Sequence, residues 1–102
     1  MPETKLAKRM TVIADITIKP TLLNEFLKLG AKGYHCVVVF GKGEHEQIGD
    51  LLTGSALVRI ELVTTPEVAD AIMDYVHSGK FHNYALTAYV DNVEVDERDT
   101  FF

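Results

Sequence analysis

Gly41, Lys42 and Gly43 have the residue types of a small anion-binding loop. Glycine lets the backbone adopt conformations in which successive amide groups point at one place, and the lysine adds an ammonium group beside them. The same tripeptide also forms ordinary turns in which the lysine is solvated. Taken without context the turn is the more frequent outcome, so the anion-binding hypothesis needs support from the rest of the chain.

Four histidines and one cysteine raise the question of a metal site or a catalytic centre; they are His35, Cys36, His45, His77 and His82. No pair among them has the i, i+4 helical spacing or the Cys-x-x-Cys spacing of a metal motif, and Cys36 fits a small buried residue. Ser78 follows His77, but the sequence identifies no third group that would orient such a pair for nucleophilic catalysis. We therefore expect neither a catalytic residue nor a bound metal.

The first half of the chain predicts a strand, a helix and a second strand. Residues 10–19 alternate with period two, which predicts a strand whose apolar face carries Val12, Ala14, Ile16 and Ile18. Residues 20–30 predict a helix, because Pro20 suits a first turn, an apolar face follows, and Gly30 suits a C-terminal cap. Residues 34–40 are almost all apolar and predict a buried central strand.

The second half of the chain repeats this pattern. Residues 56–63 and 84–95 predict strands, and residues 64–80 between them predict a helix that starts near Pro66 and stops at Gly79. The order β-α-β-β-α-β with right-handed crossovers predicts one α+β domain over residues 1–102, a ferredoxin-like sandwich with both helices on one sheet face. Residues 1–9 and 96–102 are expected as tails.

The other face of this sheet is expected to lack a cover. It mixes apolar and charged residues, which favours packing against copies of the same chain. The residues expected there are Ile13, Asp15, Arg59, Glu61 and part of the run Val37 to Val39.

The connection over residues 41–55 is too long for a hairpin between neighbouring strands. It holds four glycines, an acidic cluster and three apolar residues, Ile48, Leu51 and Leu52. Connections of this length are usually functional or disordered. Apolar side chains in such a loop indicate that it docks on a partner.

Composition excludes some classes of protein. The chain has 102 residues and a formal net charge of -5, so nucleic acid is not expected as a partner. No segment has the apolar length of a membrane span or of a signal peptide, and the single cysteine fits a reducing compartment. A cytoplasmic location is therefore expected.

Three segments together resemble the PII signal proteins: GAKGYHCVVVFGKG (30–43), VRIELVTTPEVADAIMDYV (58–76) and SGKFHNYALTAYVDNVEV (78–95). The nearest branch is that of the PII-like proteins of carboxysome and bicarbonate-transport systems. The resemblance implies a homotrimer of ferredoxin-like subunits that binds adenine nucleotides in clefts between subunits and has no enzymatic activity or cofactor. It further implies bicarbonate binding and control of inorganic-carbon uptake or fixation, through a transporter or another carbon-metabolism protein contacted by a T-loop at 41–55.

The resemblance also implies a set of site residues. The residues that match nucleotide-binding positions of the family are Gly33, Tyr34, His35, Gly41, Lys42, Gly43, Glu61, Lys80, Phe81, His82, Asn83, Tyr84 and Arg98. Glu61 matches a glutamate near the adenine edge, and residues 80–84 match the B-loop. Bicarbonate is assigned to Lys42, Gly43 and Arg59.

The chain departs from the family pattern at several positions. Glu44, His45 and Glu46 replace basic residues, the B-loop lacks its usual glycines, and the loop 41–55 lacks the tyrosine that relatives modify. With fewer cations, AMP or ADP is the expected nucleotide, and ATP or cyclic AMP are further candidates. The alternatives are a CutA-like trimer that binds divalent metals through its histidines, and an oligomeric scaffold without a ligand.

Overall fold

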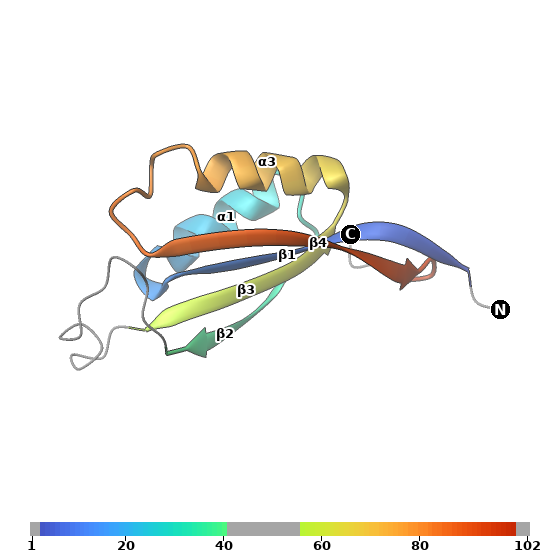
Figure 1. Cartoon of the computed structure of the whole chain (residues 1–102), viewed down its shortest axis with the longest axis horizontal. Helices are drawn as coiled ribbons and strands as arrows, with labels where there is room; N and C mark the ends of the chain where they lie inside the picture. Colours follow the sequence, from blue (N-terminus) through green and yellow to red (C-terminus); the bar gives the residue numbers. More distant parts are fainter. Residues whose placement is uncertain (1–2, 41–55, 100–102) are drawn as a thin grey trace.

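The computed structural model describes residues 3–40 and 56–99, in which four strands form one antiparallel sheet of order β2-β3-β1-β4 (Figure 1). The elements are β1 (Thr4–Asp15), the 3-10 helix η1 (Ile16–Ile18), α1 (Lys19–Lys28), β2 (His35–Val39), β3 (Leu57–Thr64), α3 (Pro66–Val76) and β4 (Leu86–Asp96). This is the ferredoxin-like β-α-β-β-α-β arrangement predicted from the sequence. The predicted T-loop 41–55, with Gly41, Lys42 and Gly43, lies outside the described residues.

The core lies between the sheet and the helices α1 and α3, which cover the same face (Figure 1). Alternate residues of β1 and β3 point into the core and are fully buried. On this face the strand register pairs Val12 with Ile60 and Ala14 with Val58. The helices contribute Phe26 from α1 and Ile72 from α3, both without exposed surface. The apolar faces of the strands, which repeat every two residues, therefore pack against the apolar faces of the helices, which repeat every 3.6 residues.

Both helices begin as their sequences predict, but α3 ends at Val76, three residues before the predicted stop at Gly79. The Thr65 hydroxyl accepts a hydrogen bond from the Val68 amide at 3.3 Å, which caps α3. Gly30 and Gly79 follow α1 and α3 with positive φ values of 116° and 94°. At Gly30 a Cβ atom would also lie 3.0 Å from Val68 Cγ2, so glycine is required there both by conformation and by the close approach of the two helices.

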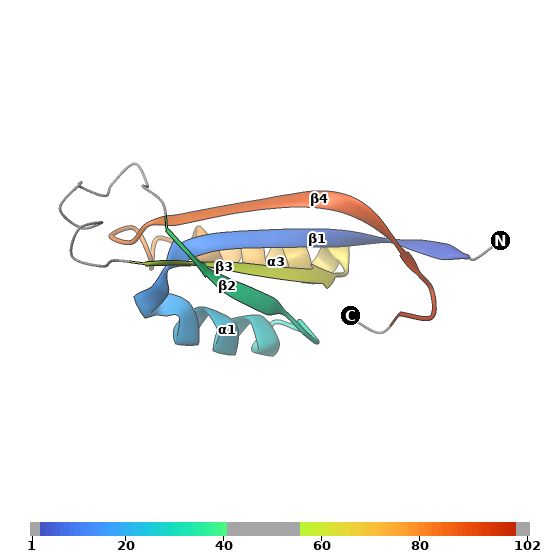
Figure 2. The ribbon, with the colours of Figure 1, turned by 90° about the horizontal axis from the view of Figure 1, so that it is seen from below.

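The prediction of a tail over residues 1–9 is wrong for Thr4–Arg9, which belong to β1. This part of β1 pairs with the end of β4, from Thr4 opposite Asp96 onward. Pairing with β3 begins at Lys8, and residues Thr4 to Ala7 pair with β4 alone, as a two-stranded ribbon that extends beyond the helices (Figure 2). Its residues are largely polar because no helix covers them, and the apolar alternation that marks a strand is therefore weak. Asp96 likewise ends β4 rather than beginning a tail.

Ile16 and Ile18, predicted to continue the first strand, instead form η1. The Asp15 carboxylate accepts hydrogen bonds from the Thr17 amide at 2.8 Å and from the Thr17 hydroxyl at 2.6 Å. These bonds turn the chain after Asp15. Ile18 remains buried in the core, so the apolar pattern persists although the backbone leaves the sheet.

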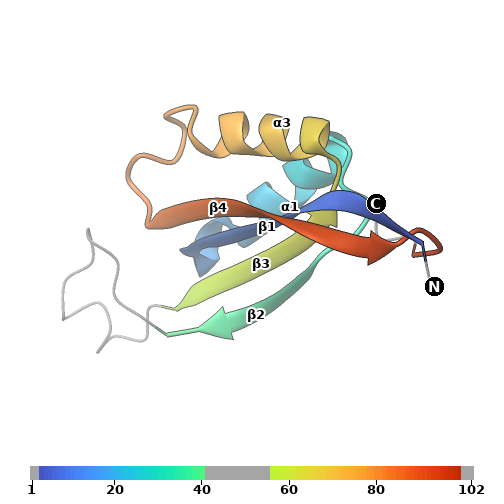
Figure 3. The ribbon, with the colours of Figure 1, turned by 45° about the vertical axis from the view of Figure 1, so that its right-hand side comes forward.

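The prediction that residues 34–40 form a buried central strand is also wrong. β2 is an edge strand (Figure 3), and Val37, Val38 and Phe40 are 46%, 54% and 78% exposed. An apolar strand with exposed side chains on both faces and an open hydrogen-bonding edge is a surface that proteins normally cover. The apolar composition of β2 therefore indicates that another surface covers this strand. The described part of the chain does not supply that surface.

Candidate ligand-binding site

A first hollow of about 180 Å³ lies where the loop from α1 enters β2, and it is lined by Gly33, Tyr34, His35, Glu61, Leu62 and Val63. Ala31 anchors this loop: its amide donates to the Phe26 carbonyl at 3.0 Å, and its side chain is buried. Strand register then sets His35 opposite Glu61. Their Nε2 and Oε2 atoms are 3.3 Å apart. The hollow thus has apolar walls, a half-exposed tyrosine ring and one histidine–carboxylate pair.

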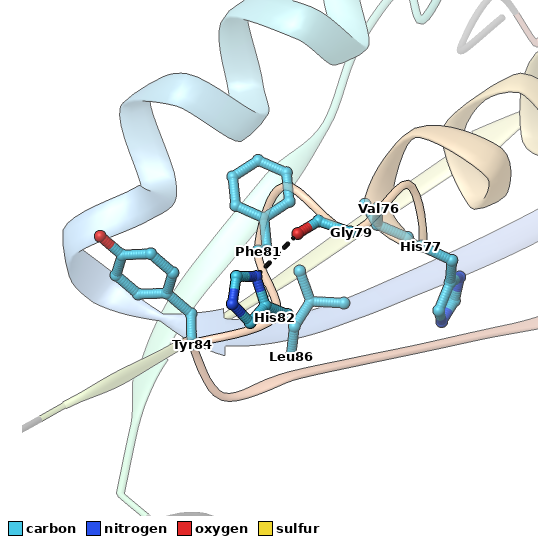
Figure 4. Close-up of a pocket in the computed structure, with 7 residues that line it drawn as sticks. All are labelled: Val76, His77, Gly79, Phe81, His82, Tyr84 and Leu86. Carbon is cyan, nitrogen blue, oxygen red and sulfur yellow. Dashed lines mark hydrogen bonds between the residues drawn. The ribbon is translucent and has the colours of Figure 1, made fainter.

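A second hollow of about 270 Å³ follows α3 and is lined by Val76, His77, Gly79, Phe81, His82, Tyr84 and Leu86 (Figure 4). His82 Nδ1 lies 2.9 Å from the Gly79 carbonyl oxygen, and His77 Nδ1 lies 2.9 Å from that of Met73. A carbonyl only accepts, so both contacts favour the tautomer that leaves Nε2 for another partner. His82 and Tyr84 lie together on one side of the hollow, and His77 lies on the other (Figure 4).

The B-loop residues 80–84 divide between core and surface. The Phe81 ring is buried and packs edge-to-face on Tyr75, with centroids 5.5 Å apart. The Lys80 ammonium lies 5.7 Å from the centroid of the Tyr75 ring, and Asn83 is exposed. Phe81 therefore anchors the loop, whereas Lys80, Asn83 and Tyr84 are exposed and present side chains to a ligand.

The two hollows lie toward opposite ends of β3. The last part of β3 lines the first hollow, whereas the second hollow adjoins the start of this strand. There the Asp15 amide donates to the Ala85 carbonyl, and the Ile16 amide donates to the Ala56 carbonyl, both at 3.0 Å. The two loops concerned lie at opposite ends of the sheet (Figure 1). Within residues 3–40 and 56–99, the predicted nucleotide-binding residues thus form two separate groups, and Arg98, which follows the end of β4, lines neither hollow.

The predicted cations differ in what they already bind. Arg98 donates from Nε and Nη2 to Asp96 at 2.8 and 2.6 Å, and this bonding holds the pKa of the Asp96 carboxyl below its usual value. Arg59 is exposed, lies on the face that α1 and α3 leave open, and has no hydrogen bond or ion pair to another described residue. Of the two, Arg59 is free to receive an anion, whereas Arg98 must first leave Asp96.

The open sheet face holds a polar cluster that sequence reasoning did not identify. Arg9 donates to Asp91 at 3.1 and 2.6 Å, and strand register places this pair on the same face as His35 and Glu61. Residues so far apart in sequence carry no local signal. Only a correct strand alignment, with paired residues on one face, could have brought them together.

Metal binding through the histidines finds no support in the described part of the chain. No group of three or more His, Cys, Asp or Glu residues that could hold an ion occurs there. Nor does any described helix have the length and apolar character needed to cross a bilayer.

Comparison with protein families identifies the chain. Residues 7–99 match the family described as "Nitrogen regulatory protein P-II". The match spans nearly the whole chain, which therefore belongs to the P-II family of signalling proteins. No curated protein matches the chain.

Solved structures share the fold. A PII-like signaling protein from Thermus thermophilus has 28% identity and a TM-score of 0.79, over 98% of this chain and 99% of that one. CPII from Thiomonas intermedia, bound to ADP, AMP and acetate, has 21% identity and a TM-score of 0.77 over 91% of each chain. CPII bound to ADP and bicarbonate has 21% identity and a TM-score of 0.78 over 94% of each chain.

The pairing of Arg98 with Asp96 gives a testable pH effect. We expect Arg98→Gln to raise the pKa of Asp96 part of the way to its usual value, because the side-chain bonds are lost while the Arg98 backbone amide still donates. A folded-state pKa below the unfolded value means that this stabilisation is present above the unfolded pKa and is lost as pH falls through the folded one. Carboxyl carbon NMR measures the titration directly.

Arg9→Gln is the matched control, because it removes the corresponding partner of Asp91 and leaves Asp96 untouched. An Asp96 titration that is the same in Arg98→Gln as in the wild type would show that the pair does not persist in solution.

Proposed function

We propose that the chain is the subunit of a cytoplasmic homotrimeric sensor that binds an adenine nucleotide between subunits. The main support is that predicted nucleotide-binding residues line two hollows toward opposite ends of β3: Gly33, Tyr34, His35 and Glu61 line the first, and Phe81, His82 and Tyr84 line the second. At about 3.3 Å per residue, the part of β3 from Leu57 to Val63 spans roughly 20 Å. The two groups of residues in one chain are therefore too far apart to contact the same end of a ligand. A neighbouring subunit that supplies the other group would complete a site at each interface.

The open sheet face supports assembly from copies of the chain. Strand register places Val37, Ile13, Val63 and Tyr89 on this face among charged residues. Tyr89 is 50% exposed, as is about half of Val37. A closed ring of three subunits would cover both this face and the free edge of β2. Apolar residues would then be buried while the charged ones find partners across the interface.

The two hollows differ in the ligand groups that they suit. The first has apolar walls, an aromatic ring and a carboxylate that accepts hydrogen bonds, which suits a flat base with an amino group. The second lies beside the exposed Lys80 and adjoins the end of the sheet from which residues 41–55 leave, which suits phosphates. We infer AMP or ADP as the ligand, with cyclic AMP as a further candidate and ATP as a weaker one because cations are few.

We further propose that the sensor binds bicarbonate and controls inorganic-carbon uptake or fixation. CPII, which shares the fold, is bound to ADP and bicarbonate in one of its structures. In this chain Lys42 and Gly43 would hold the ion together with Arg59, whose guanidinium is unpaired among the described residues. The loop 41–55 would carry the signal to a bicarbonate transporter or another carbon-metabolism protein. No catalytic step or cofactor forms part of this role.

Nucleotide binding is tested by calorimetry. We expect ADP or AMP to bind, and Lys42→Ala and Asn83→Ala to weaken binding by about tenfold or more, because each removes a hydrogen bond that contributes on the order of 1.5–3 kcal/mol to a charged partner. Leu27→Ala, at an exposed position on α1, is the control. Equal affinity for guanine nucleotides would refute the assignment to adenine.

Assembly is tested by light scattering. We expect three times the monomer mass for the wild type, and dissociation for Val37→Asp, because an unpaired carboxylate would be buried in the interface. Val37 lies outside both hollows, so lost nucleotide binding in this variant would show that the site needs a second subunit. A monomeric wild type that binds nucleotide at full affinity would contradict the shared site.

Bicarbonate is tested through its coupling to the nucleotide. At fixed pH and ionic strength, with chloride as the control anion, we expect millimolar bicarbonate to change nucleotide affinity by about fivefold or more. Arg59→Gln and Gly43→Val should abolish the change, since one removes the cation and the other restricts the backbone. An affinity that bicarbonate leaves unchanged would remove the ion from the proposal while the nucleotide site stands.

A further inference from the structure

We propose that the pair His35–Glu61 makes nucleotide binding depend on pH, because a protonated His35 competes with the ligand for the Glu61 carboxylate. The inference rests on the proposed function, since it assigns regulation to the first hollow of the nucleotide site. Both side chains line that hollow.

The geometry places the two groups in direct contact at the mouth of the hollow. His35 is the first residue of β2, and strand register sets it opposite Glu61. The Nε2 and Oε2 atoms are 3.3 Å apart, and the side chains are 62% and 25% exposed. The histidine is therefore open to protons from solvent, whereas the carboxylate lies deeper and is the group that a ligand in the hollow would meet.

Charged and titratable neighbours surround the pair on every strand of the open face. They are Arg59 on β3, Arg9 on β1, Tyr89 and Asp91 on β4, and Tyr34 in the preceding loop. Arg9 is held chiefly by Asp91, and its raised pKa also reflects the charge of Glu61. Histidine is the residue type whose charge ordinarily changes between pH 5 and 8. His35 is the only histidine among these described groups.

The two protonation states of His35 leave Glu61 with different capacities. Beside a neutral imidazole, the carboxylate can accept a hydrogen bond from a ligand amino group. Beside an imidazolium, it forms a charge-assisted bond to Nε2–H and becomes a weaker acceptor for the ligand. A phosphate would be repelled by Glu61, so the amino-bearing base is the part of a nucleotide expected here. Nucleotide binding should then release a proton from His35 to the buffer.

The experiment is calorimetry of ADP binding to the full chain at about pH 8 and pH 6, without bicarbonate. For the wild type we expect the affinity to fall roughly three- to tenfold over this range. His35→Gln and Glu61→Gln should each remove that fall, and the double variant should behave as the single ones do. Protonation of the ADP phosphates is common to all variants and cancels in the comparison.

Glu67→Gln is the matched control for Glu61→Gln, since it removes an exposed carboxylate that lines neither hollow and should keep the wild-type pH profile. Buffers of different ionisation enthalpy should report more proton release on binding in the wild type than in His35→Gln, in which only the ADP phosphates contribute. The same pH profile in wild type and His35→Gln, or an affinity that rises on acidification only when His35 is present, would overturn this inference and leave the nucleotide site standing. No ADP binding at any pH would overturn the proposed function together with the inference.

Discussion

The structure depends on one constraint: α1 and α3 both pack on the same face of the sheet. Each crossover between β-strands is right-handed, and both crossovers therefore place their helices on one side. One apolar layer, with Phe26 and Ile72 at its centre, holds the fold together. The opposite face and the β2 edge receive no cover from the described chain. The exposed valines, the polar cluster and the division of the candidate site between two hollows all follow from this arrangement.

The supply of positive charge limits the ligands that this acidic protein can bind. Several cations in the described residues are already engaged: Arg9 by Asp91, Arg98 by Asp96 and Lys8 by Asn92. Arg59 and Lys80 have no ion pair to a described residue. A ligand with few negative charges, or one that shares backbone amides with these cations, is therefore favoured over a triphosphate. This balance agrees with the preference for AMP or ADP that the sequence indicates.

A site that responds to protons would suit the proposed role in sensing inorganic carbon. Hydration of CO₂ gives bicarbonate and a proton together, so the two concentrations are linked by chemistry. If bicarbonate acts near Arg59 and the proton acts at His35, both signals reach the same sheet face from neighbouring strands. Their couplings to the nucleotide would be separate free energies, which can be measured independently.

Local sequence signals predict the order of the main strands and helices, because period-two and 3.6-period apolar residues, Thr65 as a cap and Gly30 as a stop act over short distances along the chain. The sequence also indicated the family through the segments around Gly33 and Asn83. That Thr4–Arg9 is strand becomes clear from the fold alone, because this part of β1 depends on pairing with β4 rather than on its own composition. The same holds for β2, whose apolar residues require burial without saying what covers them, and for the His35–Glu61 contact. Strand register joins residues that are distant in sequence, and no local pattern encodes it.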